Sequence, residues 1–241
     1  MEKETKKFED EALEAASSPL EDAAPDLASV NRTKKRSDRD RVIRLTVTAM
    51  LAALIVVMAF TPLGYLRVAA LSISFMMVPV AVGSIAVGPT AGAILGAIFG
   101  VTSFIQCFTG DTLGAILVAE SIPRTLVVTV GARILAGWLP GLLYKKALRP
   151  HDKKEGWSLL VSSLAASLLN TLFFLGLLAL LFMNKQFTPA EAEALGGLTN
   201  VLNTVIAIAA GVNAPIEMAV CGILGTAVTK AVLALQKRMR R

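Results

Sequence analysis

A few amide side chains lie inside otherwise apolar segments, and they are the groups best placed to bind a polar molecule. Each is costly in hydrocarbon unless it faces a partner or a water-filled cavity. Hydrogen bonds between helices would satisfy any one of them. As a group they also suit a pocket for an uncharged polar vitamin or sugar, because an amide offers both donors and an acceptor. We therefore assign three of them to a substrate-binding site, namely Gln106, Asn170 and Asn203. Asn200 and Asn213 lie in the same apolar run as Asn203.

Arg124 follows Pro123 at the predicted outer boundary of an apolar helix. Its guanidinium fork is suited to hold a carboxylate through two hydrogen bonds. An arginine at an interface can also extend to lipid phosphates. We assign Arg124 to the substrate-binding site, with the lipid contact as the competing interpretation.

Two opposite charges are predicted to lie at one depth inside the membrane. Arg133 lies twelve residues before Lys145, and Glu217 lies thirteen before Lys230. At about 1.5 Å of rise per residue, both should be roughly 18 to 20 Å from these lysines. Since a lone charge at that depth is costly, we predict a structural ion pair, direct or through one water, with Arg124 facing away if the helix is regular.

Groups that would support catalysis or metal binding are few. The single histidine, His151, is in a basic loop, and Cys107 and Cys221 are isolated from each other and from a general base. A glycine-rich phosphate loop of the form G-x-x-x-x-G-K-[ST] is absent from the sequence. We therefore predict no catalytic residue, no metal ligand and no cofactor, and we do not expect an enzyme.

Long charge-free runs position these polar residues in a membrane. About 20 residues cross the hydrocarbon core, so Val68–Gly110 should form two spans, separated at Gly88-Pro89. The sequence thus predicts an all-α membrane protein with six transmembrane helices. Two of the other four runs, Leu45–Leu66 and Trp157–Met183, are also free of charge. The remaining two are Ile122–Tyr144, which Arg124 and Arg133 interrupt, and Thr199–Thr229, which contains Glu217.

Glycines recur at every fourth position in the third predicted span, at Gly88, Gly92, Gly96 and Gly100. Residues four apart share a helix face, so these glycines form a smooth stripe that allows another helix to approach closely. We predict that the stripe packs helices together; a role in letting one helix slide against another is the secondary interpretation.

Basic residues indicate the orientation. They precede the first span, fill the loop after the fourth and end the chain, so the positive-inside rule places both termini in the cytoplasm. The net charge of +6 is then explained by basic residues that set the orientation in the membrane and contact lipid headgroups. Nucleic acid is therefore not an expected partner. Residues 1–40 are rich in charge and poor in large apolar side chains, which predicts a disordered cytoplasmic tail before a membrane domain over residues 41–241.

Several short segments together resemble the S components, the substrate-binding membrane subunits of energy-coupling factor (ECF) vitamin transporters. The resemblance covers about Arg44 to Lys237, and the Phe60–Gly64, Gly96–Ile105 and Asn170-Thr171 segments look most like the pantothenate-specific members. The remaining segments are Ala49–Ala53, Val87–Gly92, Pro123-Arg124, Gly141–Lys145, Pro215–Glu217 and Lys230–Val232.

The resemblance implies a high-affinity vitamin-binding subunit in a bacterial plasma membrane. Such a subunit delivers its vitamin to a transmembrane coupling protein driven by two cytoplasmic ATPases. In the family an A-x-x-x-A surface on the first helix contacts the coupling protein, and here Ala49 and Ala53 occupy it. Outer loops act as a lid, for which Pro62–Leu71, with Gly64 as a hinge and Tyr65, is the candidate.

The ligand is not fixed by the sequence. Pantothenate is favoured by the resemblance, and folate, riboflavin and thiamine are the alternatives. An unrelated six-span channel would need a repeated pore signature, and an intramembrane enzyme would need paired catalytic groups at one depth. We find neither in the sequence.

Overall fold

The structure, a computed structural model, describes residues 27–61, 65–68, 71–146, 148, 155–210 and 213–239. Contacts divide the chain into two units, Met1–Ile43 and Arg44–Arg241. The packing reported below is that of the second unit.

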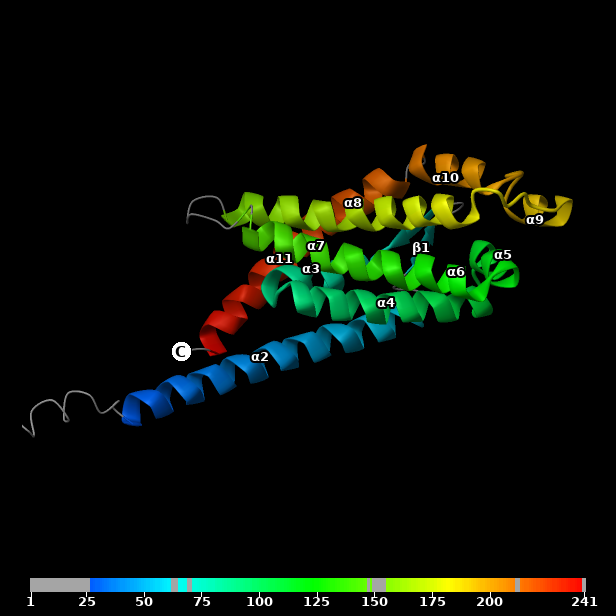
Figure 1. Cartoon of the computed structure of the whole chain (residues 1–241). Helices are drawn as coiled ribbons and strands as arrows, with labels where there is room; N and C mark the ends of the chain where they lie inside the picture. The colour runs from blue at the N-terminus through cyan, green and yellow to red at the C-terminus, as the bar shows by residue number, and fades with distance from the viewer. Residues whose placement is uncertain are drawn as a thin grey trace, which may run out of the picture. The chain divides into compact units, whose positions relative to one another are not determined.

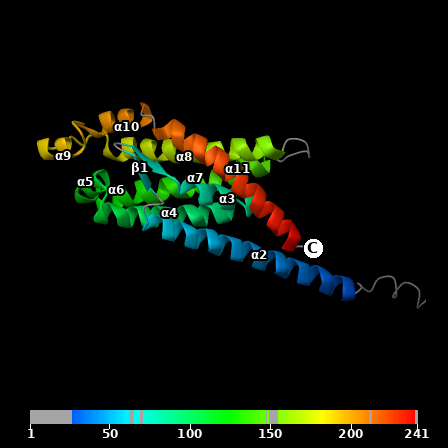
Figure 2. The ribbon, with the colours of Figure 1, turned by 180° about the vertical axis from the view of Figure 1, so that it is seen from behind.

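The described elements follow one another from α2 to α11 (Figures 1 and 2), and most of the described residues are helical. Their bounds are α2 Leu27–Ala59, β1 Tyr65–Val68, β2 Leu71–Ser74, α3 Met77–Ala86, α4 Pro89–Thr109, α5 Thr112–Glu120, α6 Ile122–Leu126, the π-helix η1 Val127–Gly131, α7 Ala132–Lys146, α8 Glu155–Phe182, α9 Pro189–Ala194, α10 Val201–Ala210 and α11 Asn213–Met239.

Five helical segments in the described residues are long and apolar enough to cross a membrane. Four of them correspond to predicted spans, and the fifth, Pro215–Met239, covers only the later part of the predicted sixth. The segments are Asp38–Ala59, Pro89–Thr109, Ile122–Lys146, Gly156–Phe182 and Pro215–Met239. A multi-pass membrane protein is therefore supported, whereas six spans are not confirmed and the orientation of the termini stays a prediction.

The predicted second span differs most from the structure. Its first part forms strand β2, which pairs antiparallel with β1 just before it, with Tyr65 opposite Ser74 and Val68 opposite Leu71. Only ten residues of it, Met77–Ala86, are helical, which is about half the length of a membrane crossing. The all-α prediction was wrong here because Leu71–Ser74 alternates apolar and polar residues, a strand pattern, within a run that we counted as a helix.

The predicted sixth span is also corrected. It consists of α10 and the separate helix α11, which begins at Asn213. Pro215 explains this start, because proline is tolerated in the first turn of a helix, where its missing N–H has no intrahelical acceptor. The apolar run continues across the break, so hydrophobicity alone did not reveal it.

Two predictions about loops and termini lie partly outside the described residues. Residues 1–26 are outside them, and residues 27–40 form the first part of α2, so the division at residue 40 stays a prediction. In the predicted lid, residues 62–64, including the Gly64 hinge, are likewise outside the described part, and Tyr65–Val68 forms β1. Strand β2 contacts α11.

The glycine stripe brings α4 against α7, as predicted. A Cβ at Gly92 or Gly96 would overlap the backbone carbonyl of Gly137 or Arg133, and one at Gly100 would lie 2.6 Å from Cα of Val130. Such approach gives van der Waals packing where no hydrophobic drive exists between helices. Gly88 is different: its φ of 137° places it at the cap before Pro89, with open space around a Cβ.

We predict that Gly96→Ala destabilises the protein by about 1 to 3 kcal/mol, the usual cost of overpacking. The added methyl group meets the Arg133 carbonyl, which is backbone and cannot rotate away. Thermal unfolding in detergent measures the effect. Gly176→Ala in α8 is the matched control, because a Cβ there meets nothing within 4 Å, and it should be neutral or stabilising by up to about 1 kcal/mol. Equal melting temperatures for the two variants would contradict this role for Gly96.

Candidate functional site

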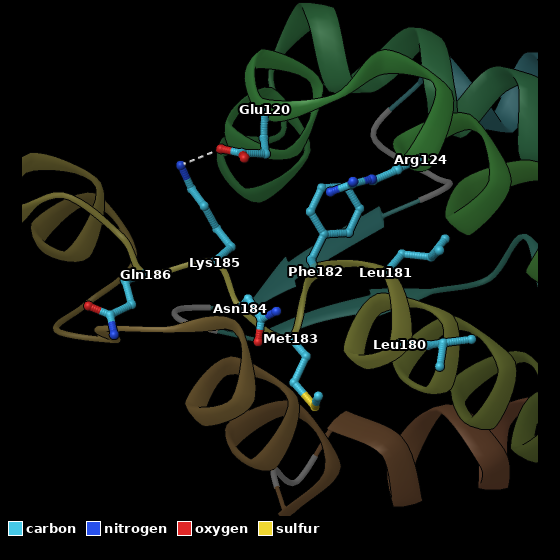
Figure 3. Close-up of a pocket in the computed structure, with 9 residues that line it drawn as sticks. All are labelled: Glu120, Arg124, Leu180, Leu181, Phe182, Met183, Asn184, Lys185 and Gln186. Atoms are coloured by element: carbon cyan, nitrogen blue, oxygen red, sulfur yellow. Dashed lines mark hydrogen bonds and ion pairs between the residues drawn. The ribbon is translucent and has the colours of Figure 1, made fainter.

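Polar side chains gather in two places, one at the end of α8 and one in its middle. The first, which we call the Arg124 pocket, has a volume of about 430 Å³ (Figure 3). Its walls come from α5, α6 and the segment where α8 ends, and consist of Glu120, Arg124, Leu180, Leu181, Phe182, Met183, Asn184, Lys185 and Gln186.

Lys185 is held by carboxylates at the edge of this pocket. Its Nζ lies 2.8 Å from Glu120 and 3.9 Å from Glu191, and the hydrogen bond from Lys185 to Glu120 is the main cause that raises the pKa of the lysine. Glu191 also accepts from the backbone N–H of Thr188 at 2.7 Å, which chiefly lowers the pKa of this carboxyl. The positive charge of Lys185 is thus already matched by protein carboxylates.

Arg124 is the other cation that lines the pocket. It lies in α6 directly after Pro123, and it is exposed. Asn184 and Gln186 add amide groups that the sequence analysis missed, because they follow the apolar span rather than interrupt it. The pocket can therefore offer a guanidinium and two amides to a small ligand.

Gln106 and Asn203 do not line this pocket. Gln106 Nε2 donates to the carbonyl oxygen of Ala59 at 2.6 Å, which satisfies a group at the end of α2. Asn203 is exposed, and its Nδ2 donates to Thr199 Oγ1 at 3.2 Å. Both amides thus have protein partners, and their contact with substrate stays a prediction.

The second place, which we call the central cluster, is made by Arg133 with Phe99, Phe174 and Glu217. It includes Asn170, which lies one helical turn before Phe174 on α8. The guanidinium carbon of Arg133 lies 4.6 Å from the ring centroid of Phe99 and 5.3 Å from that of Phe174. Such cation–π contacts stabilise a desolvated cation by about 2 kcal/mol or more. Arg133 Nη1 also donates to the Thr129 carbonyl at 3.0 Å.

Glu217 and Asn170 bring acceptors to the central cluster. Glu217 interacts electrostatically with Arg133, and the predicted direct or water-bridged pair stays a prediction. The Oε1 atom of Glu217 and the Oδ1 atom of Asn170 are buried and have no hydrogen-bond partner in the described structure. The side chain of Asn213, noted in the sequence, is outside the described residues.

The helix between Arg124 and Arg133 is not regular. Residues 127–131 form the π-helix η1, in which each turn holds more residues than an α-turn. Arg124 was predicted to face away from Arg133 on the condition that the helix is regular. That condition does not hold. They nevertheless lie in different surroundings, Arg124 in the pocket and Arg133 between two phenyl rings. Single π-turns are frequent at functional sites.

Ala49 and Ala53 are exposed on α2. The buried positions of the same segment, Val47, Leu51 and Ile55, lie on the opposite side at 100° per residue. The two alanines thus form a smooth surface that faces away from the rest of the second unit. Their contact with a partner stays a prediction.

A family model decides the class of protein. The model for "ECF transporter, substrate-specific component" matches residues 43–229. The chain belongs to this family. No curated protein matches the chain.

The match extends from the exposed helix α2 into α11 and so includes both polar places. The chain is therefore a substrate-specific subunit of an ECF transporter, a membrane transport system with membrane and ATPase partners, and not an enzyme. The match carries no information on which substrate is bound.

We predict that the charges of Arg133 and Glu217 are thermodynamically coupled. Arg133→Ala and Glu217→Ala should each destabilise this S component, because each leaves the other charge uncompensated. The double variant should lose less than the two single effects together, with a coupling free energy above about 0.5 kcal/mol. Unfolding in detergent measures all three variants, and strict additivity would show that the two charges find separate partners.

Proposed function

We propose that this S component binds a small carboxylate-bearing vitamin, pantothenate first among them, with high affinity and delivers it to a separate coupling protein and its two ATPases. In this proposal the subunit lies in a bacterial plasma membrane and both of its termini are in the cytoplasm. Folate, riboflavin and thiamine are the alternative ligands. Family membership supports the transport function, and residues of the Arg124 pocket support the ligand class.

The observation that carries the ligand class is Arg124 in a pocket of about 430 Å³. Small-molecule sites range over about 300 to 1,000 Å³, so the pocket suits one vitamin. The charge of Lys185 is matched by Glu120, which leaves a carboxylate to be recognised by Arg124. This favours pantothenate over thiamine, a cation, and over riboflavin, which carries no carboxylate.

The ligand is tested by a binding panel on the purified subunit. Pantothenate, folate, riboflavin, thiamine, biotin and niacin are titrated in turn, and a bound vitamin should be recovered unchanged because the subunit is not an enzyme. Binding of none of the six would contradict the vitamin proposal. Tight binding of thiamine or riboflavin alone would contradict the proposal that Arg124 recognises a carboxylate of the ligand.

Replacing Arg124 should weaken pantothenate binding. Arg124→Ala removes the guanidinium that binds the carboxylate, for which we expect a loss of about 1.5 to 3 kcal/mol, the usual contribution of a hydrogen bond to a charged group. Arg124→Lys should give an intermediate affinity, since it keeps the charge and loses the bidentate fork. Isothermal titration measures both, with Arg238→Ala, an exposed arginine in the last turn of α11, as the control. If Arg124→Ala changed affinity by less than about twofold, lipid phosphates would be the better partner for this side chain.

The exposed face with Ala49 and Ala53 supports docking to the coupling protein. Small side chains allow helices to approach closely in a membrane, and this face is not used for packing within the second unit. Other exposed side chains on α2, such as Met50 and Leu54, are larger and are suited to lipid.

Ala53→Trp should block vitamin uptake in cells and leave vitamin binding by the purified subunit unchanged. The indole ring would hold a partner helix away from α2, whereas both polar places of the chain lie on other helices. Leu54→Trp is the control, because Leu54 is also exposed but points about 100° away from Ala53. Normal vitamin uptake by cells with Ala53→Trp would contradict the role of this surface in docking. Loss of vitamin binding by the purified variant would contradict it too.

A further inference from the structure

The central cluster contains two buried acceptors that the protein does not satisfy. They are Oδ1 of Asn170 in α8 and Oε1 of Glu217 in α11, and neither has a hydrogen-bond partner within the described structure. A buried acceptor without a donor is costly, and a protein normally pairs such groups. Their donors therefore lie outside the described residues, and a bound molecule or water can supply them.

The contact between α8 and α11 brings these two acceptors to one place. Cys221 Sγ donates to the Ser163 carbonyl at 3.3 Å, and a Cβ at Gly225 would lie 3.0 Å from Ser163 Oγ. Lys230 meets Gly156 further along, so the helices are antiparallel. Glu217 lies one turn before Cys221, and Asn170 lies two turns after Ser163, so both are displaced in the same direction from that contact.

The two acceptors also lie on the helix faces that form the contact between α8 and α11. Asn170 and Ser163 are seven residues apart, and Glu217 and Cys221 are four apart, so each pair shares one face of its helix. Phe174 is one turn beyond Asn170 on that face and stacks on Arg133. Arg133 in turn interacts electrostatically with Glu217. The cluster thus joins two acceptors, one cation and two phenyl rings, contributed by α4, α7, α8 and α11.

We infer that the central cluster binds the hydroxyl- or amide-bearing part of the ligand through Asn170 and Glu217. These two acceptors require O–H or N–H donors, Arg133 presents a cation to a carbonyl or hydroxyl oxygen, and the rings of Phe99 and Phe174 contact carbon atoms. The inference rests on the proposed function and deepens it, because it states which second chemical group the vitamin carries. Pantothenate has such a part, with an amide and two hydroxyl groups opposite its carboxylate.

The spacing along α8 relates the cluster to the Arg124 pocket. Phe182 lines the pocket and Phe174 lines the cluster, eight residues apart on one helix, or about 12 Å. That distance is comparable to the length of an extended small vitamin. Leu178 lies between them on that face and is fully buried, so a ligand held at both ends must move this side chain aside.

The test measures binding of pantothenate, and of its analogue lacking both hydroxyl groups, to the full chain in detergent. Asn170→Leu and Glu217→Gln should each weaken pantothenate binding about tenfold or more, since each removes an acceptor or its charge. The analogue should bind wild type more weakly than pantothenate does, and the two variants should lose this discrimination. Thr109→Val, which removes an exposed hydroxyl with a local partner, should leave the affinity within about twofold.

Thermal stability without ligand separates binding from a structural role. Asn170→Leu removes an unsatisfied acceptor, so its melting temperature should be unchanged or higher while its affinity falls. A lower melting temperature with unchanged affinity would overturn the inference, as would equal discrimination between the two ligands in wild type and Asn170→Leu. If Glu217→Gln does not fold, Asn170→Leu with the analogue still decides the question.

The outcomes also separate this inference from the proposed function. If wild type binds pantothenate and both variants bind it equally well, buried water satisfies the acceptors and the inference alone is wrong. If wild type binds neither pantothenate nor another vitamin of the panel, the proposed function fails and the inference fails with it.

Discussion

The close approach of α4 to α7 positions the charged interior of this protein. At Gly96 the backbone of α4 meets the Arg133 carbonyl with no side chain between them. Phe99, three residues further on α4, is thereby held over the Arg133 guanidinium. A larger residue at Gly96 would separate the helices and withdraw the ring from the cation. The glycines of α4 thus determine both the helix packing and the environment of a buried charge.

The membrane explains why packing of this kind matters here. Many large apolar side chains are exposed, among them Leu180 at 75% and Trp157 at 72%, and such side chains are suited to lipid. Since lipid is as apolar as these side chains, burying them would not drive helices together. Association must instead come from close contact and from polar pairs, which is what Gly92, Gly96 and the Ser84 hydroxyl bonded to the Gly137 carbonyl provide.

The sequence predicts features that depend on hydrophobicity and on helix period, and it misses those that depend on local geometry. Long apolar runs located four of the five long helices, and the i, i+4 glycines predicted that α4 packs closely against another helix, which is α7. The alternation of apolar and polar residues in Leu71–Ser74 is a strand pattern, but it stands inside a run that was counted only by its hydrophobicity, so β1 and β2 were missed. The π-turn before Arg133 has no clear signature in residue type, and it changed the rotation on which one prediction depended.

For the candidate sites, residue type indicated which side chains need a hydrogen-bond partner, but the sequence did not indicate which partner each one has. Amides inside a membrane must be satisfied, which is why Gln106, Asn170 and Asn203 were assigned to a binding site; that assignment stays a prediction. Whether the partner is protein or ligand depends on atoms distant in sequence. The carbonyl of Ala59 reaches Gln106 only because α2 ends beside α4, whereas Asn170 meets no such group among the described residues. The same residue type therefore has different surroundings, which only the fold can show.

The same contacts connect the exposed face of α2 with the central cluster. The carbonyl of Ala59 on α2 accepts from Gln106 on α4, and a Cβ on Gly83 of α3 would meet side chains of both Leu51 and Leu95. Helix α4 then contacts Arg133 through Gly96 and Phe99. Because packed interiors do not deform continuously, a displacement of α2 must be absorbed by a shift of α4 or by rearrangement of these few contacts. A partner docked on Ala49 and Ala53, as proposed, would thus be separated from Arg133 by α2 and α4, and α4 is the helix whose glycines bring its backbone against Arg133.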